Sequence, residues 1–349
     1  MFKDFNLETA NQIMLLFDLP KAANVVNIKE FNHVYKIMLH DGQILYLKTY
    51  TKDWYGDFNN NAKDISGCVV HEACAYKMLK SNGLPAPNIV LSEETDNNPF
   101  GRPFLLLSEL KGSCLTNAFE NNDIESIAAQ LISVGQYMKK MHNIVMSFPG
   151  YIMTLEGPME MPDTNWQHSI WTKEHWQKVT SNFMNSYLKT MDIPEPTIIE
   201  ANKFYNENKY EFEKCYDKYV FVHGDCHASQ FFLKKNGMSN WEVSGVVDME
   251  VASSGAAIHD LMKISIELAA KAFHSDYYKN YNWWEPLFSG YGGEPNFNAF
   301  KIGWLTTGAE SFWCQNWTQW SCNFDKIYQH ILQSQNWRQL FDLSNIRTE

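Results

Sequence analysis

The chain reads His223-Gly224-Asp225-Cys226-His227-Ala228-Ser229-Gln230 between two apolar runs, and further along it reads Val246-Val247-Asp248-Met249-Glu250. Transfer of a phosphate from a nucleotide to a hydroxyl needs a carboxylate that orients and deprotonates the hydroxyl. It also needs oxygen ligands that hold magnesium against the phosphates. Asp225 is the candidate base, and Gln230 and Asp248 are the candidate metal ligands. The two segments therefore predict a phosphoryl-transfer site.

These segments resemble the aminoglycoside phosphotransferase and choline kinase family, whose signature is a His-Gly-Asp, an amide five residues after the Asp, and a later metal-binding Asp. The resemblance implies a protein-kinase-like fold, Mg²⁺ as cofactor and ATP or GTP as phosphate donor. The family amide is usually Asn, so Gln230 is a departure. Its amide oxygen is still a legitimate magnesium ligand on a longer stem. Either Gln230 binds metal, or metal binding and activity are weakened.

Length and composition indicate an ordered globular protein. The 349 residues exceed one average domain, so two lobes are expected. Hydrophobic residues make up 45% of the chain and no repeat is visible, which argues against disorder. The seven cysteines include no Cys-x-x-Cys pair, so we expect reduced thiols and no zinc site.

The net charge of −11 argues against a nucleic-acid partner, because phosphate backbones are bound by clustered Lys and Arg. A cationic small molecule suits this charge better. The N-terminus lacks a basic start followed by an apolar run, and no segment approaches the roughly 20 apolar residues that cross a bilayer. We therefore expect a cytoplasmic protein that has no membrane contact.

The first 110 residues predict a small sheet with one inserted helix. Residues 34–39 and 44–50 are strand-like runs around Asp41-Gly42, which is typical of a hairpin. The other predicted elements of this part are a helix at 7–18, a helix at 69–80, and strands at 88–92 and 104–107. Residues 1–110 are thus predicted to form an antiparallel N-terminal lobe that binds the nucleotide and ends in a hinge.

The character of the sequence changes after residue 110. Residues 124–141 carry apolar side chains at a helical period, and most of the sequence after residue 141 also favours helices. The exception is a set of short strand candidates at 219–222, 231–233 and 243–247, which enclose the opening segments. We predict an α+β, two-lobed protein-kinase-like fold, in which residues 111–349 form a larger, mainly helical lobe for catalysis and substrate binding.

If that layout holds, a lysine and a glutamate should serve the nucleotide. Lys48 lies on the second strand of the hairpin and is placed to neutralise the α and β phosphates. Glu72 lies in the helix after this strand and is the candidate partner that holds Lys48, as in kinases. On its own, each of these charges is more often solvated. Their position in the predicted lobe favours the ion pair.

The remaining nucleotide contacts are predicted from the segments that flank the hairpin. Residues 104–112 look like the hinge, and by resemblance the Ser108 carbonyl and the Leu110 amide would face the base. The alternative is a buried strand that runs into a loop. The predicted phosphate-covering loop, residues 29–34, contains no glycine, so phosphate contact must rely on Lys48, metal and loop backbone.

Four further residues around the two segments are interpreted as supports. His223 is expected to order the loop through hydrogen bonds, and His227 either does the same or lies on the surface. Asp260 matches a family Asp that buttresses the catalytic loop. Glu250 either assists the metal or is solvated.

The acceptor site is the least defined part. Trp313, Trp317 and Trp320 fall on one helical face, a stripe that is more often core than binding surface. If it binds ligand, aromatic faces and carboxylates would attract an amine, with Glu267 and Glu310 as candidates. Residues 163–190, which include three tryptophans, could wall the same site.

Several functions fit this pattern. The first is a kinase that phosphorylates a hydroxyl of an amine-bearing small molecule, in particular an aminoglycoside-type antibiotic. The second is a metabolic kinase for choline, homoserine or a sugar. A third is a pseudokinase that binds nucleotide without turnover, for which Gln230 and the glycine-free loop are the support. A protein kinase fits less well, because Asp-Phe-Gly and Ala-Pro-Glu are absent.

Overall fold

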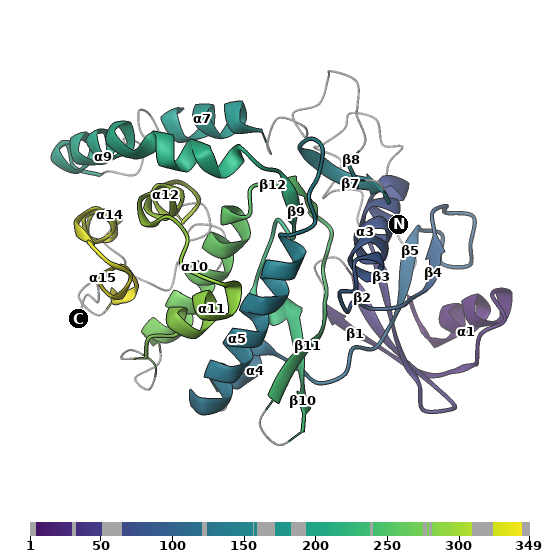
Figure 1. Ribbon diagram of the computed structural model, residues 1–349. Coiled ribbons are helices and arrows are strands. Elements are labelled where there is room, and N and C mark those ends of the chain that lie inside the picture. Colours follow the sequence, from purple (N-terminus) through teal and green to yellow (C-terminus); the bar gives the residue numbers. More distant parts are fainter. Residues whose placement is uncertain are drawn as a thin grey trace.

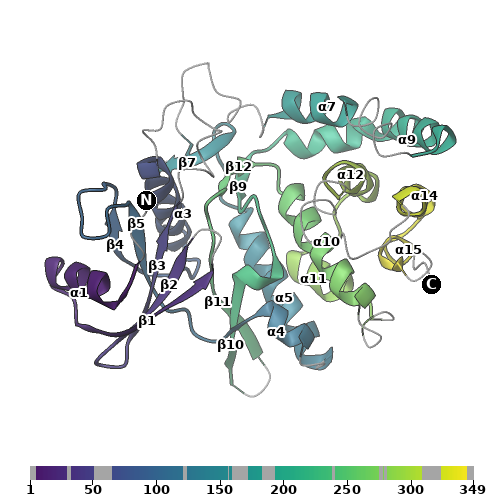
Figure 2. The same ribbon diagram turned by 180° about the vertical axis from the view of Figure 1, so that it is seen from behind.

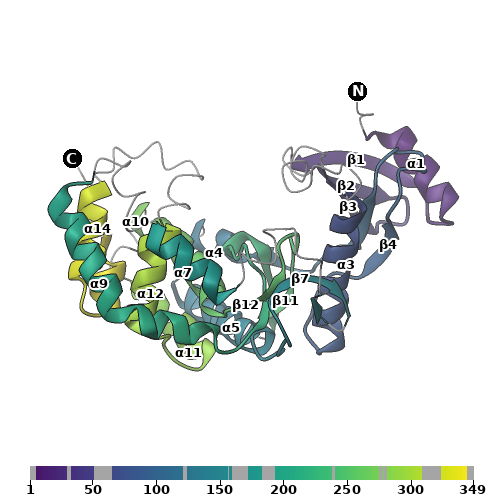
Figure 3. The same ribbon diagram turned by 90° about the horizontal axis from the view of Figure 1, so that it is seen from above.

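The computed structural model describes residues 5–29, 33–50, 65–120, 124–155, 157–158, 172–182, 193–237, 240–274, 278, 281–308 and 324–343. They form one part built on a five-stranded sheet and a larger part that is mainly helical (Figure 1). Seen from above, α1 and α14 lie at opposite sides of the molecule (Figure 3). This arrangement confirms the predicted α+β class.

The first part contains the predicted hairpin and helix. Its elements are α1 (Leu7–Leu16), β1 (Ala22–Lys29), β2 (Val34–Leu39), β3 (Ile44–Thr49), α3 (Ile65–Ser81), β4 (Ile89–Glu93) and β5 (Phe104–Ser108). The sheet order is β1-β2-β3-β5-β4, and every pair is antiparallel. Strand β1 was missed from the sequence, because its apolar residues Val25, Val26 and Ile28 do not alternate regularly with polar residues. The hairpin is confirmed in register, with Ile37 opposite Leu45.

The second part holds most of the helices and two small sheets. Its elements are β6 (Ser113–Cys114), α4 (Leu115–Glu120), α5 (Ile124–Met141), β7 (Gly150–Thr154), β8 (Gly157–Pro158), α7 (Lys173–Asn182), α9 (Glu195–Glu213), η2 (Lys214–Tyr216), β9 (Val220–Val222), η3 (Ala228–Gln230), β10 (Phe231–Asn236), β11 (Asn240–Val246), β12 (Ser253–Gly255), α10 (Ile258–His274), α11 (Trp284–Tyr291), α12 (Phe297–Gly303), η4 (Trp304–Gly308), α14 (Phe324–Gln333) and α15 (Trp337–Phe341). The sheets are ordered β11-β10-β6 and β8-β7-β12-β9. Figure 2 shows β10 and β11 beside α4 and α5.

The connection between the two parts lies just after β5. Strand β5 belongs to the five-stranded sheet, whereas β6 pairs with β10 of the second part. Gly112 lies between them with φ +99°, and a Cβ there would meet the Leu233 carbonyl oxygen at 1.9 Å. Only glycine fits this approach without a shift of the backbone. We keep residue 110 as the proposed lobe boundary.

Helix α5 passes very close to α11 and forms the centre of the second part. Gly135 of α5 and Gly290 of α11 make this approach possible, since a Cβ on either would lie 2.2 or 2.1 Å from a backbone oxygen of the other helix. The predicted helix at 124–141 is confirmed with the same bounds. Its buried face includes Leu131, Val134 and Met138.

The tryptophans of the C-terminal region that the structure describes belong to the core. Trp283, Trp284, Trp304 and Trp337 are all buried, and Phe341 stacks among them. Trp313, Trp317 and Trp320 lie outside the described residues.

Among the described helices, none combines the length and the apolar character that a membrane span requires.

Candidate active site

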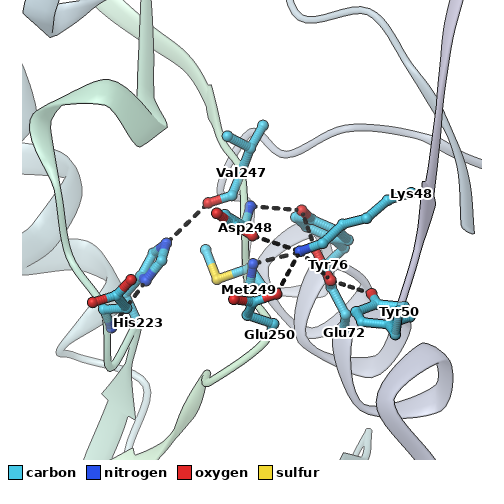
Figure 4. Close-up of polar contacts among 10 residues, drawn as sticks. Lys48, Tyr50, Glu72, Tyr76, His223, Val247, Asp248, Met249 and Glu250 are labelled. Carbon is cyan, nitrogen blue, oxygen red and sulfur yellow. Dashed lines mark hydrogen bonds and ion pairs between the residues drawn. The ribbon is translucent and has the colours of Figure 1, made fainter. Parts of the chain in front are cut away.

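Lys48 carries a buried ammonium that contacts three carboxylates (Figure 4). Its Nζ lies 2.8 Å from Glu72 Oε2, 2.5 Å from Asp248 Oδ1 and 3.2 Å from Glu250 Oε2. Burial by itself would lower the pKa of Lys48, but the three carboxylates raise it well above its usual range. Lys48 is therefore charged at any physiological pH. One side chain thus joins β3 to the segment after β11.

Glu72 is fully buried on α3 and uses both carboxylate oxygens. Besides Lys48, its Oε2 accepts a hydrogen bond from the Tyr50 hydroxyl. Its Oε1 accepts from the Tyr76 hydroxyl at 2.8 Å and from the Met249 amide at 3.2 Å. Tyr76 lies one helical turn after Glu72, a spacing that places both side chains on one face. A buried carboxylate without such partners would be costly, and this set of donors satisfies both oxygens of Glu72.

Asp248 adopts a left-handed backbone conformation with φ 68°, which Asp tolerates better than most residues. The Tyr76 hydroxyl accepts a hydrogen bond from the Asp248 amide at 3.0 Å and helps to hold this conformation. As a result the Asp248 carboxylate faces Lys48 (Figure 4). Glu250, two residues on, is also buried, and burial raises its pKa to about 7, with Lys48 opposing the shift and Asp248 adding to it. It is not a solvated side chain.

The predicted catalytic loop, residues 223–230, begins directly after β9 and is held by Asp260 from α10. The amides of His223 and Gly224 donate to the two oxygens of Asp260, at 2.7 and 2.9 Å. His142, directly after α5, contacts the same carboxylate at 3.1 Å. Burial raises the pKa of Asp260, but the contacts with His142 and His223 together outweigh it and the pKa is lowered. Asp260 is thus ionised and lies beneath the loop, where the sequence predicted a buttress.

His223 connects the two predicted segments. It is completely buried, and its Nε2 lies 2.9 Å from the Val247 carbonyl, next to Asp248. Its Nδ1 lies 3.4 Å from the Asp225 amide. These contacts support the proposed ordering role.

Asp225 is partly exposed and is contacted by two nitrogen groups. Its Oδ1 lies 3.0 Å from His227 Nε2 and 2.8 Å from Lys263 Nζ of α10. Burial raises the pKa of Asp225, but the His227 hydrogen bond and the Lys263 charge reverse this and lower it far below its usual range. Burial likewise opposes protonation of His227, whereas Asp225 and Glu267 raise its pKa to about 9. Asp225 is therefore a firmly ionised carboxylate.

Glu267, also on α10, contacts the same loop. It accepts a hydrogen bond from the Ala228 amide, and its carboxylate lies 3.6 Å from His227 Nδ1 and 3.8 Å from Lys271 Nζ. Its contacts hold the turn after Asp225. An acceptor contact for Glu267 stays a prediction, and Glu310 lies outside the described residues.

Gln230 is buried and closes the turn after Asp225. Its side-chain Oε1 accepts a hydrogen bond from the His227 backbone amide at 2.7 Å. The backbone amide of Gln230 donates to the His227 carbonyl at 3.1 Å. The Gln230 carbonyl accepts from the Val247 amide at 3.1 Å. The longer side chain therefore reaches back to the loop backbone. An amide oxygen has two lone pairs, so this bond leaves one for a metal.

The donor atoms around Asp248 fit magnesium. Carboxylate and amide oxygens are its ligands in nucleotide sites, where one or two protein groups act together with phosphates and water. No group of three or more His, Cys, Asp or Glu side chains within the described ranges is arranged to hold a metal by itself. Asp248, Gln230 and Glu250 are all compatible with such a shared site. Metal binding by Gln230 and Asp248 remains a prediction.

The hinge residues lie where β5 leaves the first sheet. The backbone of Ser108 pairs with Asn88, with the Ser108 amide donating at 2.9 Å. Leu110 packs against Gly245 of β11, where a Cβ would meet its side chain at 2.5 Å. Contact of Ser108 and Leu110 with a base stays a prediction. Residues 30–32 of the phosphate-covering loop lie outside the described residues, as does most of 163–190.

Several residues that touch the predicted site were missed from the sequence. Tyr50, Tyr76 and Lys263 all contact a predicted site residue. A signal existed for Tyr76, because it follows Glu72 by one turn on the predicted helix at 69–80, and Lys263 follows Asp260 at the same kind of spacing on α10. Tyr50 gave none.

Cys226 lies beside Asp225 and is completely buried. Burial and the neighbouring carboxylates raise the pKa of its thiol well above its usual range. It packs in the core beneath the loop and has no reactive character in this conformation.

The central region of the chain matches a known protein family. Residues 69–282, more than half of the chain, match the family model described as the phosphotransferase enzyme family. A search of curated proteins found no match.

Solved structures share the fold. The GDP and kanamycin complex of APH(2")-IIia has a TM-score of 0.51 and 10% identity, covering 93% of this chain and 97% of that one. Macrolide 2'-phosphotransferase MphH from Brachybacterium faecium has a TM-score of 0.50 and 11% identity, covering 95% and 98%. A thermostable mutant of aminoglycoside phosphotransferase APH(4)-Ia has a TM-score of 0.50 and 14% identity, covering 93% and 92%. The protein-kinase-like fold is thereby confirmed, and the family match shows that this chain belongs to the phosphotransferase enzyme family.

Proposed function

We propose that this protein is a kinase that transfers the γ-phosphate of ATP or GTP to a hydroxyl of a small-molecule acceptor. The observation that carries the proposal is Lys48, whose buried ammonium contacts Glu72 and Asp248 at once. A lysine held by a helical glutamate, next to an aspartate that comes just after a strand, is the arrangement kinases use for nucleotide phosphates. Lys48 lies on β3, Glu72 lies on α3, and Asp248 lies in the loop after β11.

The nucleotide would be held from the first part of the chain. Lys48 would neutralise the α and β phosphates while Glu72 fixes its position. The Ser108 carbonyl and the Leu110 amide would face the base. Asp248 and Gln230, with Glu250 nearby, would hold Mg²⁺. Bound there, the metal would offset the negative charge of the phosphates.

Asp225 would orient the acceptor hydroxyl towards the γ-phosphorus. A bond forms between the acceptor oxygen and phosphorus, the bond to the bridging oxygen breaks, and ADP or GDP leaves. The hydroxyl proton passes through Asp225 to solvent. Because the pKa of Asp225 is strongly lowered, its value lies in orientation more than in basicity. Asp260 and His223 keep the loop in this geometry.

Two acceptor classes fit this site. An aminoglycoside-type antibiotic is suggested by the net charge of −11 and by the kanamycin complex of one structural relative. A metabolic hydroxy compound such as a sugar is favoured by a specific observation. The carboxylate of Glu267, which was expected to attract an amine, is taken up by His227, Lys271 and the Ala228 amide.

The proposal is tested by nucleotide consumption with Mg²⁺ across a panel of aminoglycosides, amino alcohols, sugars and sugar acids. Asp225→Asn should keep nucleotide affinity within about twofold, by calorimetry, and lose at least about 100-fold in turnover. Asp217→Asn is the matched control, since this exposed carboxylate pairs with Lys173 at the surface. Full turnover in Asp225→Asn would refute the assigned role. A wild-type protein that binds nucleotide but responds to no acceptor would favour the pseudokinase.

A further inference from the structure

Lys263 places a cation against Asp225, the residue proposed to orient the acceptor hydroxyl. It lies on α10, one turn after Asp260, and its Nζ is 2.8 Å from Asp225 Oδ1. His227 Nε2 lies 3.0 Å from the same oxygen. The side chains of Lys263 and Asp225 are 26% and 35% exposed, so both remain open to a ligand.

Nitrogen groups occupy both carboxylates at this point. Lys263 and His227 contact Asp225, and His227 and Lys271 contact Glu267. Both carboxylates are already paired. Neither is left to bind an ammonium group of an acceptor.

We propose that Lys263 is a specificity-determining residue, which disfavours an ammonium group beside the accepted hydroxyl and favours acceptors with a neutral or anionic group there, such as a sugar or a sugar acid. The inference rests on the proposed kinase function and defines its acceptor class. The recognising groups are the Lys263 ammonium, which would donate to an oxygen of the acceptor, and the Asp225 carboxylate, which accepts from its hydroxyl.

Charge repulsion sets the size of the effect. Like charges a few ångströms apart repel even near a protein surface, and neither Asp225 nor Glu267 would be free to offset an ammonium next to Lys263. We expect a discrimination of about 10- to 100-fold in kcat/KM between acceptors that differ only in charge. A lysine that served only to hold Asp225 would change the rate equally for all acceptors.

The experiment compares matched acceptors in the full-length enzyme with saturating nucleotide and Mg²⁺. One series is glucose, glucuronate and glucosamine, a second is glycerol, glycerate and serinol, and kanamycin is the polycationic probe. The variants are Lys263→Met and Lys263→Glu. Lys271→Met is the control, because this lysine of the same helix contacts Glu267 and not Asp225. Calorimetry with nucleotide checks that each variant retains its fold.

The expected result is a wild-type preference for the neutral or anionic member of the series that is turned over. Lys263→Met should reduce this preference about tenfold or more, and Lys263→Glu should shift it to the ammonium compound, with a smaller change in Lys271→Met. A wild-type preference for glucosamine, serinol or kanamycin would overturn the inference and leave the kinase function intact. Lys263 variants that both keep the wild-type ratio of kcat/KM between the acceptors would also overturn the inference and leave the kinase function intact. If no acceptor stimulates the wild type, the kinase proposal fails first and the inference fails with it.

Discussion

Tyr76 joins two parts of the site through a single hydroxyl. It donates to Glu72 Oε1 and accepts from the Asp248 amide. The Asp248 backbone is left-handed, a conformation that persists in a non-glycine residue only when its surroundings hold it. Tyr76 is therefore a positioning residue for the proposed metal ligand, although it need not touch substrate.

Tyr76→Phe tests this role. The ring remains, but the Asp248 amide loses its acceptor and Glu72 loses a donor, so kcat should fall about tenfold, the equivalent of one good hydrogen bond. Steady-state kinetics measure it. Tyr137→Phe is the matched control, since it removes a buried hydroxyl that donates to the Pro85 carbonyl, far along the chain from the site residues. Equal losses in kcat for both variants would mean that Tyr76 acts on stability alone.

At the scale of elements, a buried lysine caps the C-terminus of helix α14. Lys301 of α12 donates to the carbonyls of Leu332 and Ser334, both at 2.8 Å, and its ammonium lies over the ring of Phe204 at 4.5 Å. These carbonyls have no later helical amide to bind. Lys301 thus fastens α12 and α14 together and satisfies the helix end.

Lys301→Met should lower the free energy of unfolding by about 1–3 kcal/mol at pH 7, because two buried carbonyls lose their donor. Burial lowers the pKa of Lys301 to about 8, below its usual value. Between that value and the ordinary lysine pKa the unfolded chain binds more protons, so the wild type gains stability as pH rises. Denaturant unfolding at pH 7 and pH 9.5 should show the gap to Lys301→Met widening. The exposed Lys203→Met should match the wild type at both values.

The elements also show what a sequence can predict. The hairpin of β2 and β3 and the helix α5 were predicted correctly, because an Asp-Gly turn and a regular apolar period are local signals. Strands β7 and β12 were missed. Each is short, and Ser253 pairs with Tyr151 and Val222, which lie far from it in the sequence. Such strands are defined by their partners rather than by their own residues.

On the scale of the whole molecule, Glu72 couples the sheet part to the catalytic part. Its carboxylate contacts Lys48 and Tyr50 on one side and the Met249 amide on the other. Sequence reasoning could pair Glu72 with Lys48, because both lie in the first part at a spacing known from kinases. It could not find the bond to Met249, since a contact between residues 177 positions apart depends on how the two parts meet.

Glu72→Gln should weaken both nucleotide binding and turnover. The amide cannot accept all of these donors and no longer balances Lys48, so the KM for nucleotide should rise about tenfold while kcat falls as well. Kinetics at varied nucleotide concentration separate the two effects. Glu207→Gln, an exposed acid of α9 with only a 4.0 Å contact to Lys203, serves as control. A rise in KM with wild-type kcat would show that the hydrogen bond from the Met249 amide to Glu72 does not contribute to turnover.

The buried thiol of Cys226 makes the catalytic loop observable in a different way. In the folded loop it is shielded and its pKa is raised, whereas Cys114 is partly exposed. A thiol-reactive reagent can therefore reach Cys226 only when the segment beside Asp225 opens. The rate at which Cys226 is labelled therefore reports how often this segment opens. The factor by which bound nucleotide slows the labelling would measure how strongly the donor substrate rigidifies the loop.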